Sequence, residues 1–342
     1  MIGDWNKKEK PLLGLLGSGG GLGYLAGRVS DVDDLTYTIS NSGSSFTLRS
    51  VGTVNYTVDW GDGSDEETST STTLAHTYSS SGTYKVKINS NSGSYRPKFD
   101  SSGDEDQITS VKVSVEDSSL FSTNIERAFR GAQNMTEYTQ VSAATSSVTD
   151  FERTWLDCSG LTSFPLIDTS SGTNFVATWR NCSDLTTFPQ IDTSSATTFQ
   201  NTWMGCNFLN SFPTIDTSNA SNITGTWRGC ARIITFPSLD FSSGANFERA
   251  WQNCTRMTTY PANRFDTTGT LNSVAFRHAW LNCALTAQSI ENILTSLDTN
   301  GAQNITLGIS GGSNAAKSTW STAANTAYTN LINKGWTISY NS

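Results

Sequence analysis

The sequence predicts a multidomain chain: a β-sandwich, then an α/β solenoid of 24-residue repeats, then an α/β unit that closes the solenoid. Tryptophan, cysteine and proline recur at fixed spacing through the middle of the chain. Strand-like segments around a Gly-Asp-Gly turn precede the repeats, and two helix-strand patterns follow them. We place the parts at 1–31 (a Gly-rich segment), 32–103 (the sandwich), 104–283 (the solenoid) and 284–342 (the closing unit).

Composition narrows the classes of partner. A chain of 342 residues has room for two or three domains, and its formal net charge is −8. Because no basic cluster stands out along the sequence, we expect no nucleic-acid partner. No apolar run reaches the roughly 18 to 20 residues that span a bilayer, so we expect no membrane insertion.

The Gly-rich segment contains the stretch KPLLGLLGSGGGLGYLAG. Lysines followed by apolar residues are typical of a signal peptide, but so much glycine disfavours the helical core of one. We expect the segment to be an anchor that orders when it binds another protein chain. The residues expected to be buried there are Leu12, Leu13, Leu15, Leu16, Tyr24 and Leu25.

The segment 54–88 carries the signature of the β-sandwich. TVDW and TYKVKI alternate like half-buried strands, and GDGS between them is a tight turn that requires glycine. We expect a structural role for His76. A strand at 110–115 is expected to cover the open end of the solenoid.

The repeats place the same residue types at the same positions. In every copy, cysteine stands three residues after tryptophan, and an apolar residue stands four residues before tryptophan. The six pairs are Trp155/Cys158, Trp179/Cys182, Trp203/Cys206, Trp227/Cys230, Trp251/Cys254 and Trp280/Cys283. A single copy cannot bury its own apolar face, so a sustained period means stacked copies around a continuous core.

Each copy divides into three predicted elements. Phe, Trp and Cys at i, i+4 and i+7 favour one face of a short helix. The following Leu-Thr-Ser-Phe type of segment favours a short strand that proline ends. Ile-Asp-Thr-Ser favours a turn in which Asp and Ser bond nearby backbone groups.

Two ladders of equivalent residues have more than one interpretation. We expect the cysteines to be buried, reduced thiols, because metal sites usually need Cys-x-x-Cys pairs or histidine partners; a bonded role is the alternative. We expect turn capping by the aspartates that follow the proline, whereas a row of calcium ligands is the alternative. These aspartates are Asp168, Asp192, Asp216 and Asp240.

A row of hydroxyl residues is the candidate contact surface. Eight residues after each of the first five tryptophans stands a serine or threonine. If the row faces outward, it forms a flat ridge suited to weak multivalent contact with glycans or a neighbouring protein; alternatively, Ser and Thr simply suit an exposed strand. The row is Ser163, Thr187, Ser211, Thr235 and Thr259.

The closing unit has its own pattern after residue 284. Ile290, Ile293, Leu294 and Leu297 share one face of a predicted helix, with Thr286 as its N-cap. NITLGIS then predicts a strand, a second helix should end at Gly335, and WTISY predicts a last strand.

The sequence contains no recognisable catalytic motif. Gly-x-Ser-x-Gly, His-Glu-x-x-His and the phosphate-binding loop are all missing from it. We therefore predict no enzyme activity, no catalytic residues, no cofactor and no metal site.

The repeats resemble the BspA-like leucine-rich repeats of bacterial and phage surface proteins over about residues 105 to 283, although Thr-Trp or Ala-Trp stands where that family has Met-Phe. Trp60-Gly61-Asp62-Gly63, followed by His76-Thr77-Tyr78, resembles a PKD domain, which has an Ig-like sandwich fold. The Gly-rich start and the LINKGWTISY ending resemble structural proteins of bacteriophages, the start those of marine phages (cyanophages).

This resemblance implies a non-enzymatic virion structural protein. It would be tail-associated, like a fibre or adhesin, and anchored to other virion proteins by its N-terminus, with the repeats facing a host-surface glycan or protein. We expect multiple copies, as in a homo-oligomer. A capsid decoration protein without an external ligand and a cellular, extracellular BspA-like adhesin are the alternatives.

Overall fold

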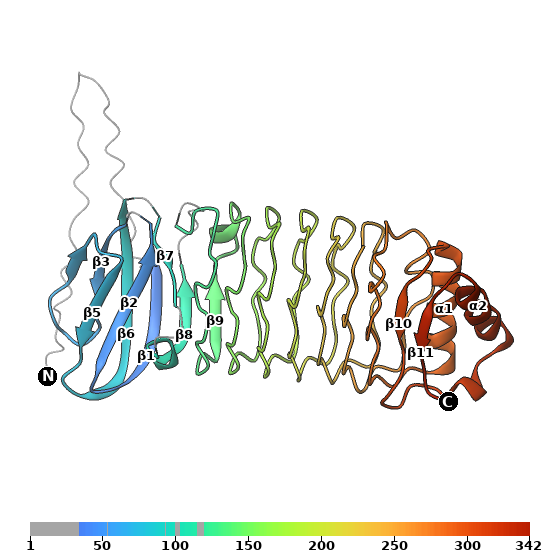
Figure 1. The fold of residues 1–342 in the computed structure, drawn as a ribbon. Coiled ribbons are helices and arrows are strands. Elements are labelled where there is room, and N and C mark those ends of the chain that lie inside the picture. The colour runs from blue at the N-terminus through green and yellow to red at the C-terminus, as the bar shows by residue number, and fades with distance from the viewer. Residues whose placement is uncertain (1–33, 53, 93, 100–102, 115–119) are drawn as a thin grey trace, which may run out of the picture. The chain divides into compact units, whose positions relative to one another are not determined.

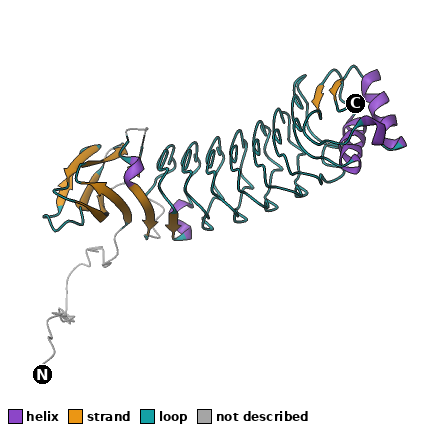
Figure 2. Cartoon of the chain, turned by 90° about the horizontal axis from the view of Figure 1, so that it is seen from below, coloured by secondary structure: helices purple, strands orange, loops and turns teal. Residues whose placement is uncertain are grey.

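The computed structural model describes residues 34–342 except 53, 93, 100–102 and 115–119. Within this range a β-domain leads into a stack of coils, and a small α/β part follows the last coil (Figure 1). Helices longer than a single turn occur only in that last part of the described chain (Figure 2). The predicted order of β-domain, repeats and α/β closing unit is thus confirmed at this level.

Two sheets form the β-domain. The larger has the order β4-β3-β6-β1-β8-β9, and the smaller has the order β5-β2-β7. Alternating burial along β1, with Leu35, Tyr37 and Ile39 inward, matches the period of a strand with one face in a core. The strands are β1 (Leu35–Ser42), β2 (Ser45–Val51), β3 (Asn55–Asp59), β4 (Glu67–Ser69), β5 (Thr73–Thr77), β6 (Ser81–Ser92), β7 (Arg96–Pro97), β8 (Ile108–Val113) and β9 (Glu137–Gln140).

The two sheets pack through aromatic side chains. Tyr37 of β1 meets Phe46 of β2 edge to face, with ring centroids 6.5 Å apart. Tyr37 also contacts Phe99 in the same way, at 6.0 Å. Such pairs add specific geometry to the burial of large apolar surfaces and so hold the sheets together.

The β-domain continues into the coils without a break in the sheet. β8 pairs antiparallel with β1 on one side and parallel with β9 on the other. Tyr138 of β9 then packs on Trp155 and Phe164 of the next coil, at 5.2 and 5.6 Å between centroids. The strand expected at 110–115 is therefore present as β8, two residues earlier, and it covers the first coil.

The segment that carries tryptophan is not a helix, which corrects the sequence prediction. In each coil it is a run of tight turns that begins one residue after the apolar residue, as at 152–157 after Phe151. Alternate backbone N–H groups donate to the next coil, as from Trp155 to the Thr178 carbonyl at 2.9 Å. The coils are thus joined by bonds between copies, where a helix would bond within itself.

Left-handed backbone explains why these turns replace the helix. The residues two before and two after tryptophan have positive φ, for example Ala177 at 53° and Asn181 at 61°. Gly205 and Gly229 occupy the second of these positions in the following coils, with φ of 80° and 81°. Only Gly and, less readily, Asn or Asp adopt this conformation at small cost, and each such residue ends a helix. Phe, Trp and Cys still point inward because successive tight turns have nearly the same spacing as a helical face.

The predicted strand after each cysteine is also not a regular strand. Residues such as 161–166 form extended chain, and Thr235 and Thr259 make an isolated parallel bridge. Proline two residues after the bridge position has no N–H to donate to a neighbouring coil, which limits the backbone hydrogen bonds of this segment. The backbone hydrogen bonds between neighbouring coils are therefore too few here to form a regular strand.

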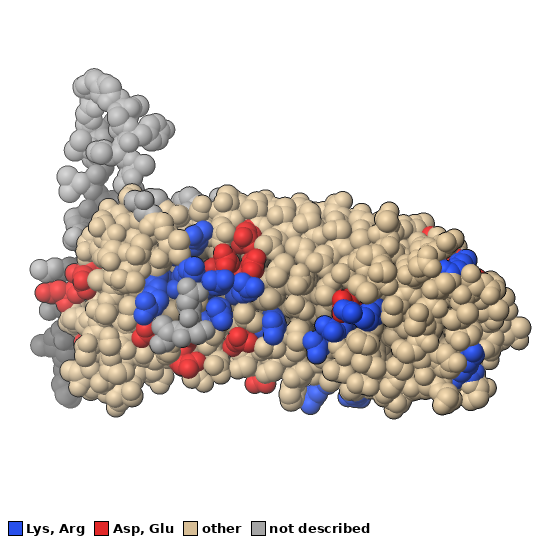
Figure 3. Space-filling view, in the orientation of Figure 1, with Lys and Arg blue, Asp and Glu red and all other residues tan. Residues whose placement is uncertain are grey.

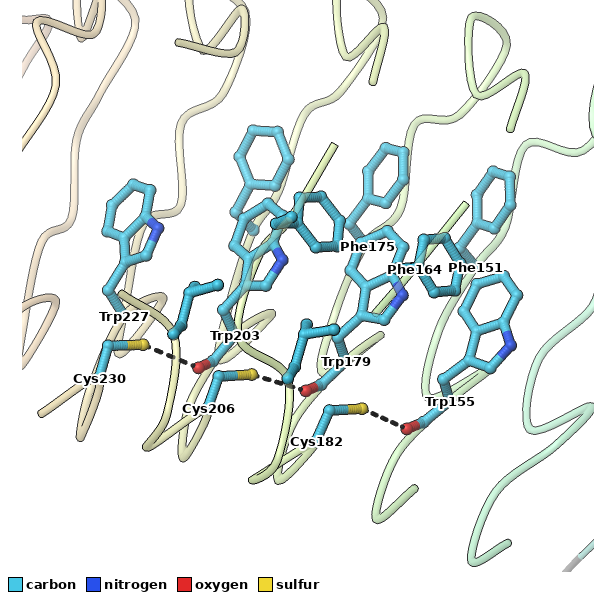
Figure 4. Close-up of a cluster of buried hydrophobic side chains, with 14 of the residues drawn as sticks. Phe151, Trp155, Phe164, Phe175, Trp179, Cys182, Trp203, Cys206, Trp227 and Cys230 are labelled. Atoms are coloured by element: carbon cyan, nitrogen blue, oxygen red, sulfur yellow. Dashed lines mark hydrogen bonds between the residues drawn. The ribbon is translucent and has the colours of Figure 1, made fainter. Parts of the chain in front are cut away.

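Stacked aromatic rings fill the core of the coils (Figure 4). The indole planes of Trp179 and Trp203 are 9° from parallel with centroids 5.6 Å apart, and Trp203 and Trp227 follow at 6.2 Å. Phe188 and Phe212, from the opposite side of each coil, meet Trp203 edge to face. All six repeat tryptophans have no exposed surface, as predicted.

The closing unit follows the prediction closely. Helix α1 (Ala287–Asn300) has Thr286 as N-cap, whose side chain accepts from the Ser289 N–H. Helix α2 (Thr322–Asn333) is shorter than expected because its N-cap is Ser321. Strands β10 (Thr306–Gly308) and β11 (Thr337–Ser339) pair in parallel and extend the coil-to-coil bonding through the Trp280 N–H to the Gly308 carbonyl.

Candidate functional site

The predicted hydroxyl ridge lies on the exposed surface. All five of its residues are exposed, in five successive coils. Thr235 and Thr259 pair directly across neighbouring coils, so the spacing along the ridge is about 5 Å. The ridge side chains therefore point toward solvent, which the sequence could not decide.

The ridge hydroxyls have no protein partners among the described residues. No hydrogen bond joins the Thr187, Ser211 or Thr235 hydroxyl to the rest of the described chain. In contrast, neighbouring hydroxyls are engaged: Thr186 donates to the Thr162 carbonyl at 3.2 Å. A free, exposed hydroxyl can donate to or accept from a ligand.

The ridge residues and their nearest neighbours along each coil carry no charge, whereas exposed charged side chains such as Arg256 and Asp192 lie farther along the coil. At seven, eight, ten and eleven residues after each of the first five tryptophans, the sequence has only Thr, Ser, Asn, Ile, Pro, Leu, Gln and Ala. Leu166 and Ile234 are the large apolar residues here, at 61% and 44% exposure. The ridge face is thus an uncharged surface of hydroxyls, methyls and proline rings.

Buried side chains support the ridge from below. Leu185, Phe188 and Ile191 recur at every third residue of one coil and are buried in the core, with two less buried residues between each pair. Because each ring stacks on its equivalent in the next coil, as Phe164 does on Phe188 at 5.9 Å, the ridge residues are held in register. A ligand that meets several coils would find their hydroxyls already arranged.

The cysteines are buried thiols with a specific role between coils. Each sulfur donates to the backbone carbonyl of the aromatic residue in the preceding coil, at 3.1 to 3.2 Å. Burial raises the pKa of the Cys254 thiol to about 12. Their predicted burial is confirmed, while the hydrogen bond adds a function beyond filling space.

A second inter-coil bond comes from threonine, a role that the sequence analysis missed. The residue before tryptophan is buried threonine in the first four tryptophan coils. Thr202 donates to the Phe175 carbonyl at 2.7 Å, and Thr226 donates to the Phe199 carbonyl at 2.8 Å. The recurrence of Thr-Trp was the available signal.

The aspartate ladder caps turns, as expected. In each coil the carboxylate accepts from the backbone N–H two residues later, for example Asp192 from Ser194 at 3.0 Å and Asp216 from Ser218 at 2.9 Å. The side-chain hydroxyls of these two serines donate to the same carboxylates at 2.7 Å. Backbone and hydroxyl donors together lower the pKa of Asp192, the backbone donor most.

His76 holds the Gly-Asp-Gly turn in place. Its Nε2 lies 2.7 Å from Asp62 Oδ2, and its ring stacks on Trp60 at 4.8 Å. The Ser64 hydroxyl and, next in size, His76 lower the pKa of Asp62 to about 2. These contacts fit the expected structural role.

The predicted anchor residues, Leu12 to Leu25, lie outside the described residues. Among the residues that the structure does describe, no helix combines the length and the apolar character that a membrane crossing requires. The described side chains also include no group of three or more His, Cys, Asp or Glu placed to hold a metal ion.

The structure gathers arginines that the linear sequence keeps apart. Lys and Arg side chains gather along the face shown in Figure 3, with Asp and Glu side chains among them and uncharged surface above. The 24-residue period brings them together because arginine occurs directly after, or two residues before, the core aromatic residue in several copies. Basic residues that are spread along the sequence therefore lie near one another on the surface of the coils.

Comparisons with family models, with curated proteins and with solved structures find no match to this chain.

Proposed function

We propose that the chain is a non-enzymatic structural protein of a bacteriophage virion, tail-associated and adhesin-like. In this proposal the β-domain is a PKD-type spacer and the coils are BspA-like repeats. Residues 1–31 would anchor the chain to other virion proteins. The ridge would face outward to a host-surface glycan or protein.

The observation that carries this proposal is the free hydroxyl ridge. Exposed Ser and Thr recur in five coils, and their hydroxyls make no bond to the described chain. Each single contact would be weak, but a particle that displays many copies gains avidity from their number. A rigid and repeated row of hydroxyls that donate and accept hydrogen bonds is suited to binding.

A charge substitution on the ridge tests the binding role. Thr187, Ser211 and Thr235 would be replaced together by Lys in the virion protein. We expect particle adsorption to host cells to fall at least tenfold, while the melting temperature changes by only a few degrees, because all three residues are exposed.

The matched control replaces Thr173, Thr197 and Ser221 by Lys. These residues are also exposed and also lie in three successive coils, but away from the ridge. Adsorption should persist in this variant. Equal adsorption of both variants would remove the ridge from the proposal.

The position of the protein in the virion is tested by cryo-electron microscopy of intact particles. Particles that carry the full chain are compared with particles whose protein lacks residues 1–31. Density for the β-domain and coils on the tail should disappear when the segment is deleted, although the purified truncated protein remains folded. Density on the capsid would favour the decoration protein, and normal incorporation of the truncated chain would contradict the anchor.

A further inference from the structure

Arginines line the side of the coils that lies across the core from the ridge. Arg180 and Arg228 directly follow a core tryptophan, and Arg130 follows Phe129, which takes the place of tryptophan in the first coil. Arg153 and Arg249 stand two residues before tryptophan. All five are half-buried, so their stems rest on the protein while part of each side chain stays accessible.

These side chains border two consecutive recesses. Arg130, Arg153 and Arg180 line the first, of about 430 Å³. Arg180, Arg228 and Arg249 line the second, of about 260 Å³. Because Arg180 belongs to both, the recesses follow one another along the stack, and one extended ligand could occupy both.

The charge of the second recess is not balanced by its lining. Its other lining residues include Gln200, Asn201 and Thr224, which are neutral, and no acidic residue. Arg249 lies 3.5 Å from Glu248 outside this lining. Arg180 and Arg228 form no ion pair with any described residue.

The first recess is more nearly balanced. Arg153 pairs with Glu152 at 2.8 Å, and Asp157 also lines the recess. Asp157, however, accepts a hydrogen bond from the Asn181 side chain at 2.8 Å. Arg130 has no ion pair within the described chain, and the Nε atoms of Arg130 and Arg180 are buried without a hydrogen-bond partner there. Because these Nε atoms are buried, an anion in the recess would bind the accessible part of each guanidinium group, for which the described chain supplies no ion-pair partner.

We propose that this row of arginines binds a strand of acidic polysaccharide that runs along the stack. Arg130, Arg180 and Arg228 are each two coils apart, which corresponds to roughly 10 Å between successive guanidinium groups. That spacing suits a polymer with a carboxylate or sulfate group on only some of its sugars. Nucleic acid carries a phosphate on every nucleotide, about 3.4 Å apart along one strand of a duplex, which is a much denser row of charges than these arginines.

The neutral residues between the arginines also favour a polysaccharide as the ligand. Amides and hydroxyls, such as those of Gln200, Asn201 and Thr224, can donate to and accept from sugar hydroxyls. The inference deepens the proposed function, on which it rests for its biological setting, by naming a second surface and the class of its ligand. The ridge would take neutral groups, and the arginine row would take charged ones.

The test is calorimetric titration of the purified full chain with acidic oligosaccharides of defined length. Heparin-derived and galacturonate disaccharides and hexasaccharides serve as the sulfated and carboxylated probes, and dextran serves as the neutral control. We expect the hexasaccharides to bind more tightly than the disaccharides, because only they are long enough to reach from one recess into the other. Binding should weaken as salt is added.

Substitutions identify the surface. Arg180→Gln should weaken hexasaccharide binding at least tenfold, since this residue lines both recesses, and the affinity of Arg180→Lys should lie between that of Arg180→Gln and that of the unmodified chain. Arg256→Gln is the matched control, because Arg256 is exposed on the turn after Cys254 and lines neither recess. It should change the affinity less than twofold, and all variants should keep the same melting temperature within a few degrees.

Several results would overturn the inference. These are binding of neither acidic probe, equal binding of dextran, or equal losses in Arg180→Gln and Arg256→Gln. Tighter binding of single-stranded DNA at the same salt concentration would make the ligand a nucleic acid instead. Since the measurement uses the isolated protein, such failures leave particle incorporation and the ridge experiment unaffected.

Discussion

The Cys206 thiol donates a hydrogen bond to the Trp179 backbone carbonyl of the preceding coil, at 3.2 Å. That carbonyl also accepts the N–H of Cys182, likewise at 3.2 Å. The same pair of bonds recurs through the stack, so the thiols form a continuous line of contacts between coils (Figure 4).

Buried thiols should make the protein sensitive to alkali. Burial raises the pKa of Cys254 to about 12, whereas the thiol ionises near 8.5 in an unfolded chain. The contribution of the buried, protonated thiol to the free energy of unfolding is therefore complete below about pH 8.5, and it is lost progressively as the pH rises toward 12. Each such thiol should contribute up to about 1.4 kcal/mol per pH unit in that window.

Urea unfolding between pH 7 and 10.5 measures this effect. In Cys254→Ala the unfolding free energy should fall less steeply with pH than in the unmodified chain. The difference in slope should correspond to about one proton, or about 1.4 kcal/mol per pH unit. A parallel fall in the two proteins would mean that this thiol does not titrate as its burial indicates. As a companion measurement, a thiol reagent should modify six cysteines after denaturation and none in the native protein at pH 7.

The tryptophan stack should dominate the stability of the coils. Trp203 lies between two parallel indoles, so Trp203→Ala should lower the unfolding free energy by about 3–5 kcal/mol. Trp203→Phe should cost distinctly less, because the indole N–H has no hydrogen-bond partner among the described residues and Phe129 fills the same position in the first coil.

Leu166→Ala provides the control for the stack, since Leu166 is 61% exposed and should contribute no more than about 0.5 kcal/mol. Chemical denaturation of the three variants gives the comparison. A similar loss in Trp203→Phe and Trp203→Ala would show that the indole makes an interaction that the geometry does not reveal.

The left-handed turn after tryptophan should select its residues strictly. Gly205 has φ of 80°, and a Cβ added there would collide with the Asn181 side-chain oxygen. Gly205→Val should therefore cost about 2 kcal/mol or more, because a β-branched residue is strained at positive φ and Asn181 must also move.

Gly205→Asn is the informative comparison and should be tolerated at under about 1 kcal/mol. Asn253 and Asn282 occupy this position in adjacent coils, where the Asn282 amide donates to Asn253 at 3.0 Å. The melting temperatures of the two variants decide the matter: similar values would show that the turn does not depend on left-handed backbone.

The turn in the β-domain should keep its carboxylate ionised in acid. The Ser64 hydroxyl, and then His76, lower the pKa of Asp62 to about 2. A group with a lowered folded-state pKa stabilises the protein above its unfolded value, near 3.9, and this contribution disappears as the pH falls toward 2. Because Asp62 is close to solvent, the contribution should not exceed about 1 kcal/mol.

Carboxyl NMR titration tests that assignment directly. The Asp62 pKa should rise toward its usual range in Ser64→Ala, and by less in His76→Gln, since the serine contact is the larger influence. A larger shift in the histidine variant would reverse the ranking of the two contacts.

The sequence alone determined the organisation of this chain. Repetition of Trp, Cys and Phe every 24 residues was enough to predict stacked copies with those side chains inside, because each copy must fill an equivalent slot. The N-cap at Thr286 and the capped turn at Asp192 were also readable, since both depend on bonds between residues that are close in sequence.

Tertiary structure decided what depends on bonds between coils. Apolar spacing cannot separate a helix from successive tight turns, and the turns prevail because positive φ at residues such as Asn181 lets N–H groups bond the next coil. The facing of Thr187 and the meeting of Arg130 with Arg180 were likewise undetermined, because the path of each coil sets which side chains share a surface. Such contacts join residues 24 or more positions apart, and only the stacked fold brings them together.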